Sequence, residues 1–395
     1  MVAVPLDPPP HAPRIWAIEG LRAWLAWTVV LSHVIQVCGI DRVVHGFWIT
    51  QFAASEAVRV FIIISGFVIT GVVLARRESW GRFITRRIFR IFPIYLLFLP
   101  LGAITMYLAQ DAVAFMPWAA DPRFTWDDSV AATITSVEQR PLSHVAPHVL
   151  LLQGVIPDSV LPKSSQSFLG PAWSLSLEWQ FYLLAPLLIW MLRRRLWSAA
   201  AVLLVATLAI LFRLEVFGHF EQPSLIFGLG HLFVIGIASR LTFDQLKNLQ
   251  FHGLAVAVAC VAIAFLFQSV FAIALWLAFL ALLADQARAP RGRALVHAAL
   301  WPFQSRIATA FGARSYAVYL AHWPVVQAAA YFVLSFGALS QWHAFAALGA
   351  ATLIGTLILA ELLHLFIERP MIRLGAAVAE GRAAWPRRRA YADCA

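Results

Sequence analysis

Three ionisable side chains lie within the first long apolar stretch of the sequence: Glu19, Arg22 and His33. Ionisable groups inside a membrane span cost about 2.5–3.5 kcal/mol each on insertion scales, so they are functional candidates. Arg22 and His33 are eleven residues apart, which places them on one helix face, about 16 Å apart along the axis. An imidazole there can accept a hydroxyl proton at neutral pH. The alternative is that Arg22 anchors the helix at the interface and His33 is a satisfied polar group.

A second candidate is Glu178, in the segment WSLSLEWQFY at 173–182. Ser174, Glu178 and Tyr182 are spaced by four residues and share a helix face. Tryptophans close to Glu178 in an apolar segment would desolvate its carboxyl group, which favours the neutral form unless a cation or histidine pairs with it. The segment is either a functional site or a polar helix start at the interface.

A basic run, TRRIFRIFP at 85–93, precedes a further apolar stretch. Arg87 and Arg90 are one helical turn apart, and guanidinium groups bind phosphate oxygens bidentately. By charge alone, a role in topology and in contacts with lipid headgroups is the favoured interpretation.

His322 lies in SYAVYLAHWP at 315–324, just before Pro324. A proline kink frees backbone carbonyls. His322 therefore either bonds a freed carbonyl in a packing role or serves a site.

The composition indicates what positions these residues. Of 395 residues, 61% are apolar and 13% are charged, about half the charged share of soluble domains. This excludes a disordered chain, an ordinary soluble enzyme and a disulfide scaffold, and it predicts an all-α polytopic membrane bundle of about ten transmembrane helices. The predicted spans are 16–38, 57–75, 91–110, 172–192, 198–216, 223–241, 251–268, 270–286, 308–335 and 343–367.

The net charge of +10 indicates a positive-inside bias in the loops of a membrane protein rather than a nucleic-acid-binding protein. With ten spans, the basic segments 76–90, 193–195, 285–306 and the residues after Pro370 fall on one side, together with the N-terminus. The opposite side holds 111–171, where six acids face three bases. We therefore expect both termini to be cytoplasmic, with insertion by the first span and no signal peptide.

The predicted organisation is an N-terminal arm at 1–15, a membrane domain at 16–370 and a basic cytoplasmic tail at 371–395. The extracytoplasmic connection at 111–171 contains a short apolar piece, 145–155, that predicts a re-entrant or interfacial helix. Glycine-rich phosphate loops, HExxH, GxSxG and Cys/His metal spacings are absent from the sequence, so we expect no metal site.

Four stretches together resemble acyltransferase family 3, a family of multi-span membrane enzymes. They are 18–33, with the Arg-x10-His pattern; 60–69 continuing into the RxxR segment at 86–93; 173–182; and 315–324 with IERP at 367–370. Position 19 is Glu where many members have Asp, and no SGNH-type hydrolase domain follows the last span. The chain looks like a stand-alone member.

The resemblance implies an O-acyltransferase that moves an acyl group, usually acetyl, from cytoplasmic acyl-CoA to a hydroxyl of a sugar, glycan or lipid-linked acceptor. Acyl-CoA would be a co-substrate rather than a permanently bound cofactor, membrane lipids would be partners, and a bacterial inner membrane would be the location. His33 would be the base or a transient acyl carrier, and Glu178 would orient the groups of the site or act as a relay for it. Arg22, Arg87 and Arg90 would serve the donor, and the predicted donor-binding set also includes Arg86, Ser65, Tyr319 and His322.

A transporter or flippase that uses buried charges as a proton relay is the competing hypothesis. Glu19, His33 and Glu178 would allow it, but the sequence shows no similarity between two halves. A non-catalytic receptor or scaffold is disfavoured because Arg22 and His33 are both present.

Overall fold

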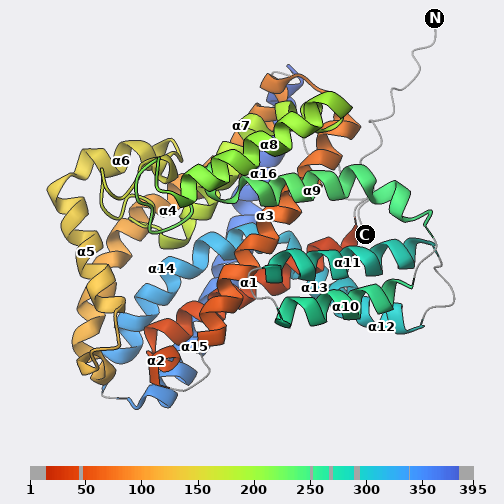
Figure 1. The fold of residues 1–395 in the computed structure, drawn as a ribbon. Coiled ribbons are helices and arrows are strands. Elements are labelled where there is room, and N and C mark those ends of the chain that lie inside the picture. Colours follow the sequence, from red (N-terminus) through yellow and green to blue (C-terminus); the bar gives the residue numbers. More distant parts are fainter. Residues whose placement is uncertain are drawn as a thin grey trace, which may run out of the picture.

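The computed structural model is built from helices (Figure 1). It describes residues 15–43, 48–249, 252–266, 270–288, 294–337 and 339–381. Within these residues, nine helices are long and apolar enough to cross a membrane, and no strand occurs. The prediction of an all-helical integral membrane protein is confirmed.

The spanning helices follow the predicted order. They are α1 (Trp16–Val37), α3 (Trp48–Arg76), α4 (Trp80–Ala112), α7 (Trp173–Leu192), α8 (Arg195–Arg213), α9 (Ile226–Leu246), α11 (Phe271–Arg288), α14 (Ser315–Leu334) and α15 (Gln341–Leu363). The last of them continues through a π-helical turn, η6 (His364–Glu368), into α16 (Arg369–Ala379).

Two predicted spans differ from the observed helices. The seventh, 251–268, corresponds to α10 (Gly253–Leu266), which has 14 residues and packs along α11. At 1.5 Å per residue, the described part of this helix extends about 21 Å, and residues 251, 267 and 268 of the predicted span lie outside the described residues. The ninth, 308–335, is divided at Arg314 into α13 (Arg306–Ala313) and α14, and a further short helix, α12 (Ala294–Gln304), precedes it.

Several sequence predictions concern residues outside those that the structure describes. These are the arm at 1–14, Arg291, Arg293 and the end of the tail from 382 onward. The beginning of the predicted tail is ordered as α16, which packs against α4.

The long connection at 111–171 is a compact helical cap. It contains α5 (Trp126–Gln139), α6 (Pro141–Val149) and four 3₁₀ turns, η1 (Val113–Phe115), η2 (Pro117–Ala120), η3 (Gln153–Val155) and η4 (Gly170–Ala172). Figure 1 shows α5 and α6 together at one end of the molecule, with α12 at the other. The predicted short helix at 145–155 is therefore split between α6 and η3. The His144 ring connects two segments of this cap. Its Nε2 lies 3.0 Å from Ser136 Oγ, and its Nδ1 lies 3.0 Å from Ser167 Oγ.

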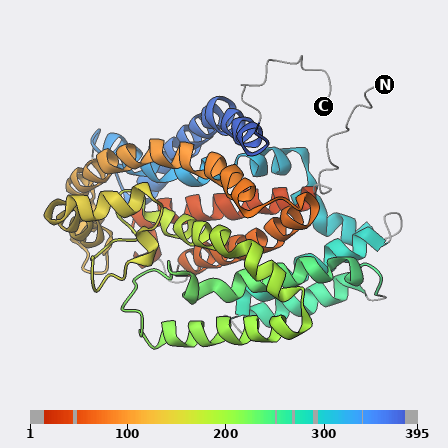
Figure 2. The same cartoon turned by 90° about the horizontal axis from the view of Figure 1, so that it is seen from above.

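The core of the bundle is aromatic and closely packed. The rings of Phe181 on α7 and Phe233 on α9 stack with centroids 4.0 Å apart. Helices α3 and α9 touch through Gly66 and Gly236, where a Cβ would lie 2.4 Å and 2.1 Å from the opposing backbone. Helix α8 has exposed apolar side chains along most of its length and lies at the margin of the molecule (Figure 2). That pattern suits a helix facing lipid.

Helix α1, which carries three of the predicted residues, lies between α3 and the α12–α15 segment. Its first turn is fixed by two close approaches. A Cβ on Gly20 would lie 1.9 Å from the Phe303 carbonyl oxygen, and one on Gly312 would lie 1.9 Å from the Glu19 carbonyl oxygen. Glycine is therefore required at both positions for α12 and α13 to pack on α1.

Candidate active site

We call the part of the candidate site around Glu178 on α7 the inner part, and the part around His33 on α1 the outer part. Ser65 on α3 donates a hydrogen bond of 2.8 Å to Glu178 Oε1. Tyr182, one turn along α7, donates a short hydrogen bond to the same oxygen. Because two hydroxyls donate to it, this oxygen acts as an acceptor. Ser65 and Glu178, which were predicted separately, therefore belong to one cluster.

Helix α4 brings Arg87 and Arg90 to this carboxylate. The Arg87 guanidinium carbon lies 5.5 Å and 5.7 Å from the ring centroids of Phe83 and Tyr182. Its buried Nε donates to no residue that the structure describes. Both arginines interact electrostatically with Glu178 and Tyr182. Two half-buried guanidinium groups one turn apart form a site suited to phosphate oxygens.

Arg86 is oriented differently from its neighbour Arg87. Adjacent helical residues differ by 100° in direction, and Arg86 forms ion pairs with Glu78 at 2.9 Å and Glu380 at 3.1 Å. It connects the start of α4 to the end of α16. A phosphate group would have to compete with these two carboxylates for Arg86, so the three arginines are not equivalent.

Arg22 lies close to the same cluster. Its guanidinium is 3.7 Å from Glu19, one turn earlier on α1, and Glu19 in turn interacts electrostatically with Arg90. The close packing at Gly312 holds the backbone of Glu19 in place. The first turn of α1 therefore contributes an acid and a base to the inner cluster.

The outer part of the site is formed by His33 on α1 with His322 and Trp323 on α14. The rings of His33 and His322 stack with centroids 5.4 Å apart and planes at 23°. Trp323 meets His33 edge-on, with centroids 4.8 Å apart. The two histidines, predicted from separate motifs, are therefore neighbours.

The hydrogen bonds of the two histidines assign their tautomers. His33 Nδ1 lies 3.2 Å from Gln36 Oε1, which is an acceptor, so Nδ1 carries a proton, and in the neutral ring Nε2 keeps its lone pair. His322 Nδ1 lies 3.3 Å from the Val318 carbonyl in the same way. His322 is fully buried and its Nε2 has no partner among the described residues, whereas His33 is half-buried. Of the two rings, only that of His33 is partly exposed.

Tyr319 and Ser174 connect the inner and outer parts. The Tyr319 hydroxyl donates to the Pro171 carbonyl at 2.7 Å and lies 2.7 Å from Ser174 Oγ. Ser174 is one turn from Glu178 on α7, and Tyr319 is one turn from His322 on α14. At 1.5 Å per residue, these steps separate the two parts by about 10 Å along the bundle.

Two contacts of the site had only weak signals in the sequence. Gln36 is three residues after His33, so helical spacing would have paired the two side chains. Trp323 directly follows His322 in the sequence. Its contact with His33 depends on how α14 crosses α1, which spacing along one helix does not reveal.

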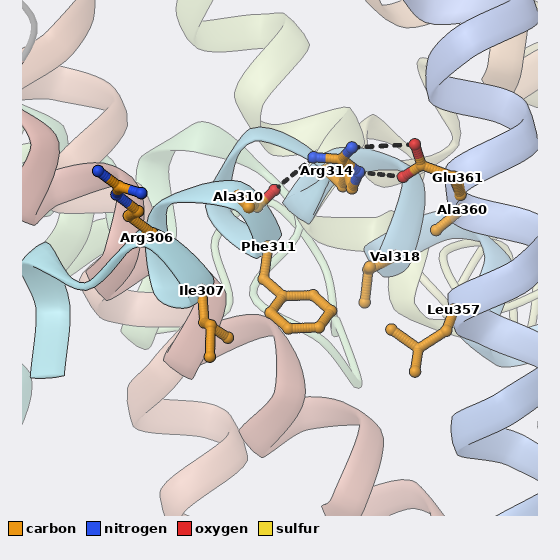
Figure 3. Close-up of a pocket in the computed structure, with 9 residues that line it drawn as sticks. All are labelled: Arg306, Ile307, Ala310, Phe311, Arg314, Val318, Leu357, Ala360 and Glu361. Atoms are coloured by element: carbon orange, nitrogen blue, oxygen red, sulfur yellow. Dashed lines mark hydrogen bonds and ion pairs between the residues drawn. The ribbon is translucent and has the colours of Figure 1, made fainter. Parts of the chain in front are cut away.

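A pocket of about 380 Å³ lies between α13, α14 and α15 (Figure 3). Its apolar wall includes Ile307, Phe311 and Leu357, and Arg314 forms an ion pair with Glu361 across it. None of the predicted site residues lines this pocket. Within the described residues, no group of three or more His, Cys, Asp or Glu side chains could hold a metal ion.

Comparison with known proteins identifies the family. The sequence profile described as an acyltransferase domain, that of acyltransferase family 3, matches residues 15–361. The chain belongs to this family. Acyltransferase MdmB from Streptomyces mycarofaciens is 30% identical over 211 residues, which are 52% of this chain and 48% of that protein. The match thus covers about half the length of the curated relative. No solved structure matches the chain.

Membership in acyltransferase family 3 confirms the resemblance drawn from the four motifs. The matched range contains His33, Glu178 and His322 and the α4 arginines, so the inner and outer clusters both lie within the family domain. The segment around Glu368 lies beyond the matched range.

Proposed function

We propose that this protein is an O-acyltransferase that uses acyl-CoA, with acetyl-CoA as the first donor to test. The acceptor would be a hydroxyl group of a sugar, a glycan, a lipid-linked sugar or a related molecule. The observation that carries the proposal is a partly exposed His33, with a proton on Nδ1, that lies about 10 Å along the bundle from a basic cluster in a chain of an acyltransferase family.

The basic cluster suits the donor because CoA is polyanionic. Arg87 and Arg90 would bind its phosphates, since guanidinium groups form charge-assisted bonds with phosphate oxygens. Arg22 would add positive charge from α1. The pantetheine arm would then extend past Ser174 and Tyr319 toward His33, over a separation of about 10 Å along the bundle axis.

The reaction would use few protein groups because a thioester is already activated. His33 Nε2 would take the proton from the acceptor hydroxyl as its oxygen attacks the thioester carbonyl. The new C–O bond forms, the C–S bond breaks, and the CoA thiolate receives the proton that His33 accepted. Glu178, held by Ser65 and Tyr182, would keep the arginines in place for the donor.

A second route through the same residues is transfer in two steps, with His33 as a transient acyl carrier. His33 Nε2 would attack the thioester carbonyl, so that a C–N bond forms, the C–S bond breaks and CoA leaves as the thiolate. The acceptor oxygen would then form the C–O bond as the C–N bond breaks, and its proton would pass to the CoA thiolate or to solvent. The two routes are separated by incubating the protein with acyl-CoA and no acceptor. Only the two-step route leaves an acylated His33 that mass spectrometry would detect.

For the membrane arrangement, we propose that the arginine end of α4 faces the cytoplasm of a bacterial cell. The segment 76–90 carries six arginines and one glutamate, and 111–171 is acidic. The donor would enter at the cytoplasmic end of the bundle. The acceptor would reach His33 from the side of α5 and α6.

The decisive test is acyl transfer by purified protein. The protein in detergent or nanodiscs would be incubated with acetyl-CoA, and free CoA thiol would be measured with and without a bacterial membrane extract. Thiol release that depends on the extract, with acetyl found on an extract component by mass spectrometry, is the expected result. His33→Ala serves as the matched control. A transporter that relays protons would release no thiol in either condition.

A further inference from the structure

A second cluster of buried ionisable side chains lies where α15 meets α16. His364 and Glu368 begin and end the π-helical turn η6, and Arg369 follows. The His364 and Glu368 side chains are 8% and 2% exposed. Single π-turns inside α-helices are rare and occur frequently at functional sites.

The hydrogen bonds of this cluster form a chain in which Arg369 donates to His364 and His364 donates to Glu368. Arg369 Nε donates to His364 Nε2 at 3.0 Å, and an arginine can only donate. His364 Nε2 is therefore an acceptor, the ring is neutral, and the proton on Nδ1 is donated to Glu368 Oε2 at 2.8 Å. The link between residues 364 and 369 spans five positions, which the wider π-turn permits. Glu368 is thus a carboxylate held by one of its two oxygens.

Helix α16 places this carboxylate against α4. A Cβ on Gly375 would lie 2.4 Å from the Phe89 Cβ, so the two helices are in close contact. Further along, Glu380 pairs with Arg86 at 3.1 Å. Arg86 and Arg90 are four residues apart and share the face of α4 that α16 covers.

The turn η6 that carries Glu368 packs against α4, and Glu368 interacts electrostatically with Arg90, as do Glu19 and Glu178. We propose that Glu368 is a positioning residue for Arg90 in donor binding, with the π-turn and His364 fixing its orientation. This inference rests on the proposed function, in which Arg90 binds the phosphates of acyl-CoA. Without Glu368, the Arg90 guanidinium would be drawn toward Glu178 and Glu19 and away from the donor.

The first test is steady-state kinetics of Glu368→Gln with acetyl-CoA. The KM for the donor should rise about tenfold, within the range of couplings between neighbouring charged residues, while kcat changes less than threefold. Glu368→Asp keeps the charge and should recover part of the lost affinity. Glu361→Gln is the matched control, because Glu361 lies two turns earlier, pairs with Arg314 and should leave KM unchanged. An unchanged donor KM in a folded Glu368→Gln protein would overturn the proposal.

A double-mutant cycle separates positioning from a merely structural role. If Glu368 acts through Arg90, then Glu368→Gln should have little further effect on donor affinity in an Arg90→Gln background. A structural role would give additive losses, and additive losses would refute the inference. If Glu368→Gln does not fold, Arg369→Gln removes only the outer hydrogen bond and should raise the donor KM about threefold, again only when Arg90 is present.

The cycle also separates this inference from the proposed function. If Arg90→Gln leaves acyl-CoA affinity unchanged, Arg90 has no role in donor binding, and both proposals fail at that point. If Arg90→Gln weakens donor binding and Glu368→Gln does not, then only the positioning role of Glu368 is rejected.

Discussion

Ser65 on α3 donates a 2.8 Å hydrogen bond to Glu178 on α7, and this bond joins two residues that are 113 positions apart in the sequence. Tyr182 donates to the same carboxylate oxygen. The carboxylate interacts electrostatically with Arg87 and Arg90. These contacts make Glu178 the common acidic partner of the two guanidinium groups that we assign to the donor.

This relationship leads to a prediction for Glu178→Gln. The amide oxygen can still accept from both hydroxyls, so the variant removes the charge while keeping most of the geometry. We expect transfer activity to fall, but by less than in His33→Ala, because Glu178 supports the site without replacing the base. Ser65→Ala, which removes one of the two hydroxyl donors, should cost less again. Equal losses in Glu178→Gln and His33→Ala would contradict this order.

A second prediction concerns the α4 arginines. Arg87→Ala and Arg90→Ala should weaken acyl-CoA binding in calorimetric titrations, because a charge-assisted hydrogen bond contributes about 1.5–3 kcal/mol. Arg86→Ala loses its ion pairs with Glu78 and Glu380 and should mainly lower the melting temperature. The exposed Arg82, on the same helix, provides the matched control. Unchanged CoA affinity in both Arg87→Ala and Arg90→Ala would remove these residues from the donor site.

A third prediction concerns topology. In a variant without native cysteines, Gly81→Cys should react with a membrane-impermeant thiol reagent only from the cytoplasmic side, and Ala131→Cys only from the outside. Both positions are exposed, and a side chain at Gly81 meets no other atom within 4 Å. Labelling of residue 81 in intact cells would contradict the orientation that the charge distribution predicts.

A fourth prediction concerns the acid stability of the helical cap. Burial lowers the pKa of His148 on α6 from 6.5 to about 4. Between these values the unfolded chain binds a proton that the folded chain does not, so the free energy of unfolding falls as pH drops from 6.5 toward 4. The loss is about 3 kcal/mol. Burial also lowers the pKa of His144, so it contributes in the same direction.

The measurement is the melting temperature of the detergent-solubilised protein at pH 7.5 and pH 5. His148→Gln should show a smaller drop than the wild type. The exposed His219 is a control of opposite sign, because its hydrogen bond with Glu215 raises its pKa. An equal drop in the wild type and His148→Gln would mean that other groups govern acid sensitivity.

Most of the architecture could be predicted from hydrophobicity, because each membrane helix satisfies its own backbone and must be long and apolar. The α13–α14 division was not predictable in this way. It occurs at Arg314, which pairs with Glu361 from a different helix.

For the site, spacing within one helix predicted the residues, and only the fold could show which of them meet. The eleven-residue spacing placed Arg22 and His33 on one face of α1. In the fold, His33 contacts α14, whereas Arg22 pairs with Glu19, which interacts electrostatically with Arg90 on α4. The different directions of Arg86 and Arg87 likewise depend on where α16 and α7 pack around α4.

The final prediction concerns His33, whose Nδ1 faces Gln36 and whose ring is stacked on His322. His33→Ala should abolish acyl transfer while helix content and detergent stability stay close to the wild type, since the ring is only half-buried. A general base contributes about 10²–10⁴-fold, so a loss below about tenfold would be too small for a base or an acyl carrier. Gln36→Ala should cost less, because it frees the ring to rotate without removing it. The assay is acetyl transfer at saturating acetyl-CoA in membranes. If His33→Ala kept nearly full activity, the proton acceptor would have to be sought first at Glu178 and then at His322, whose buried Nε2 has no partner among the described residues.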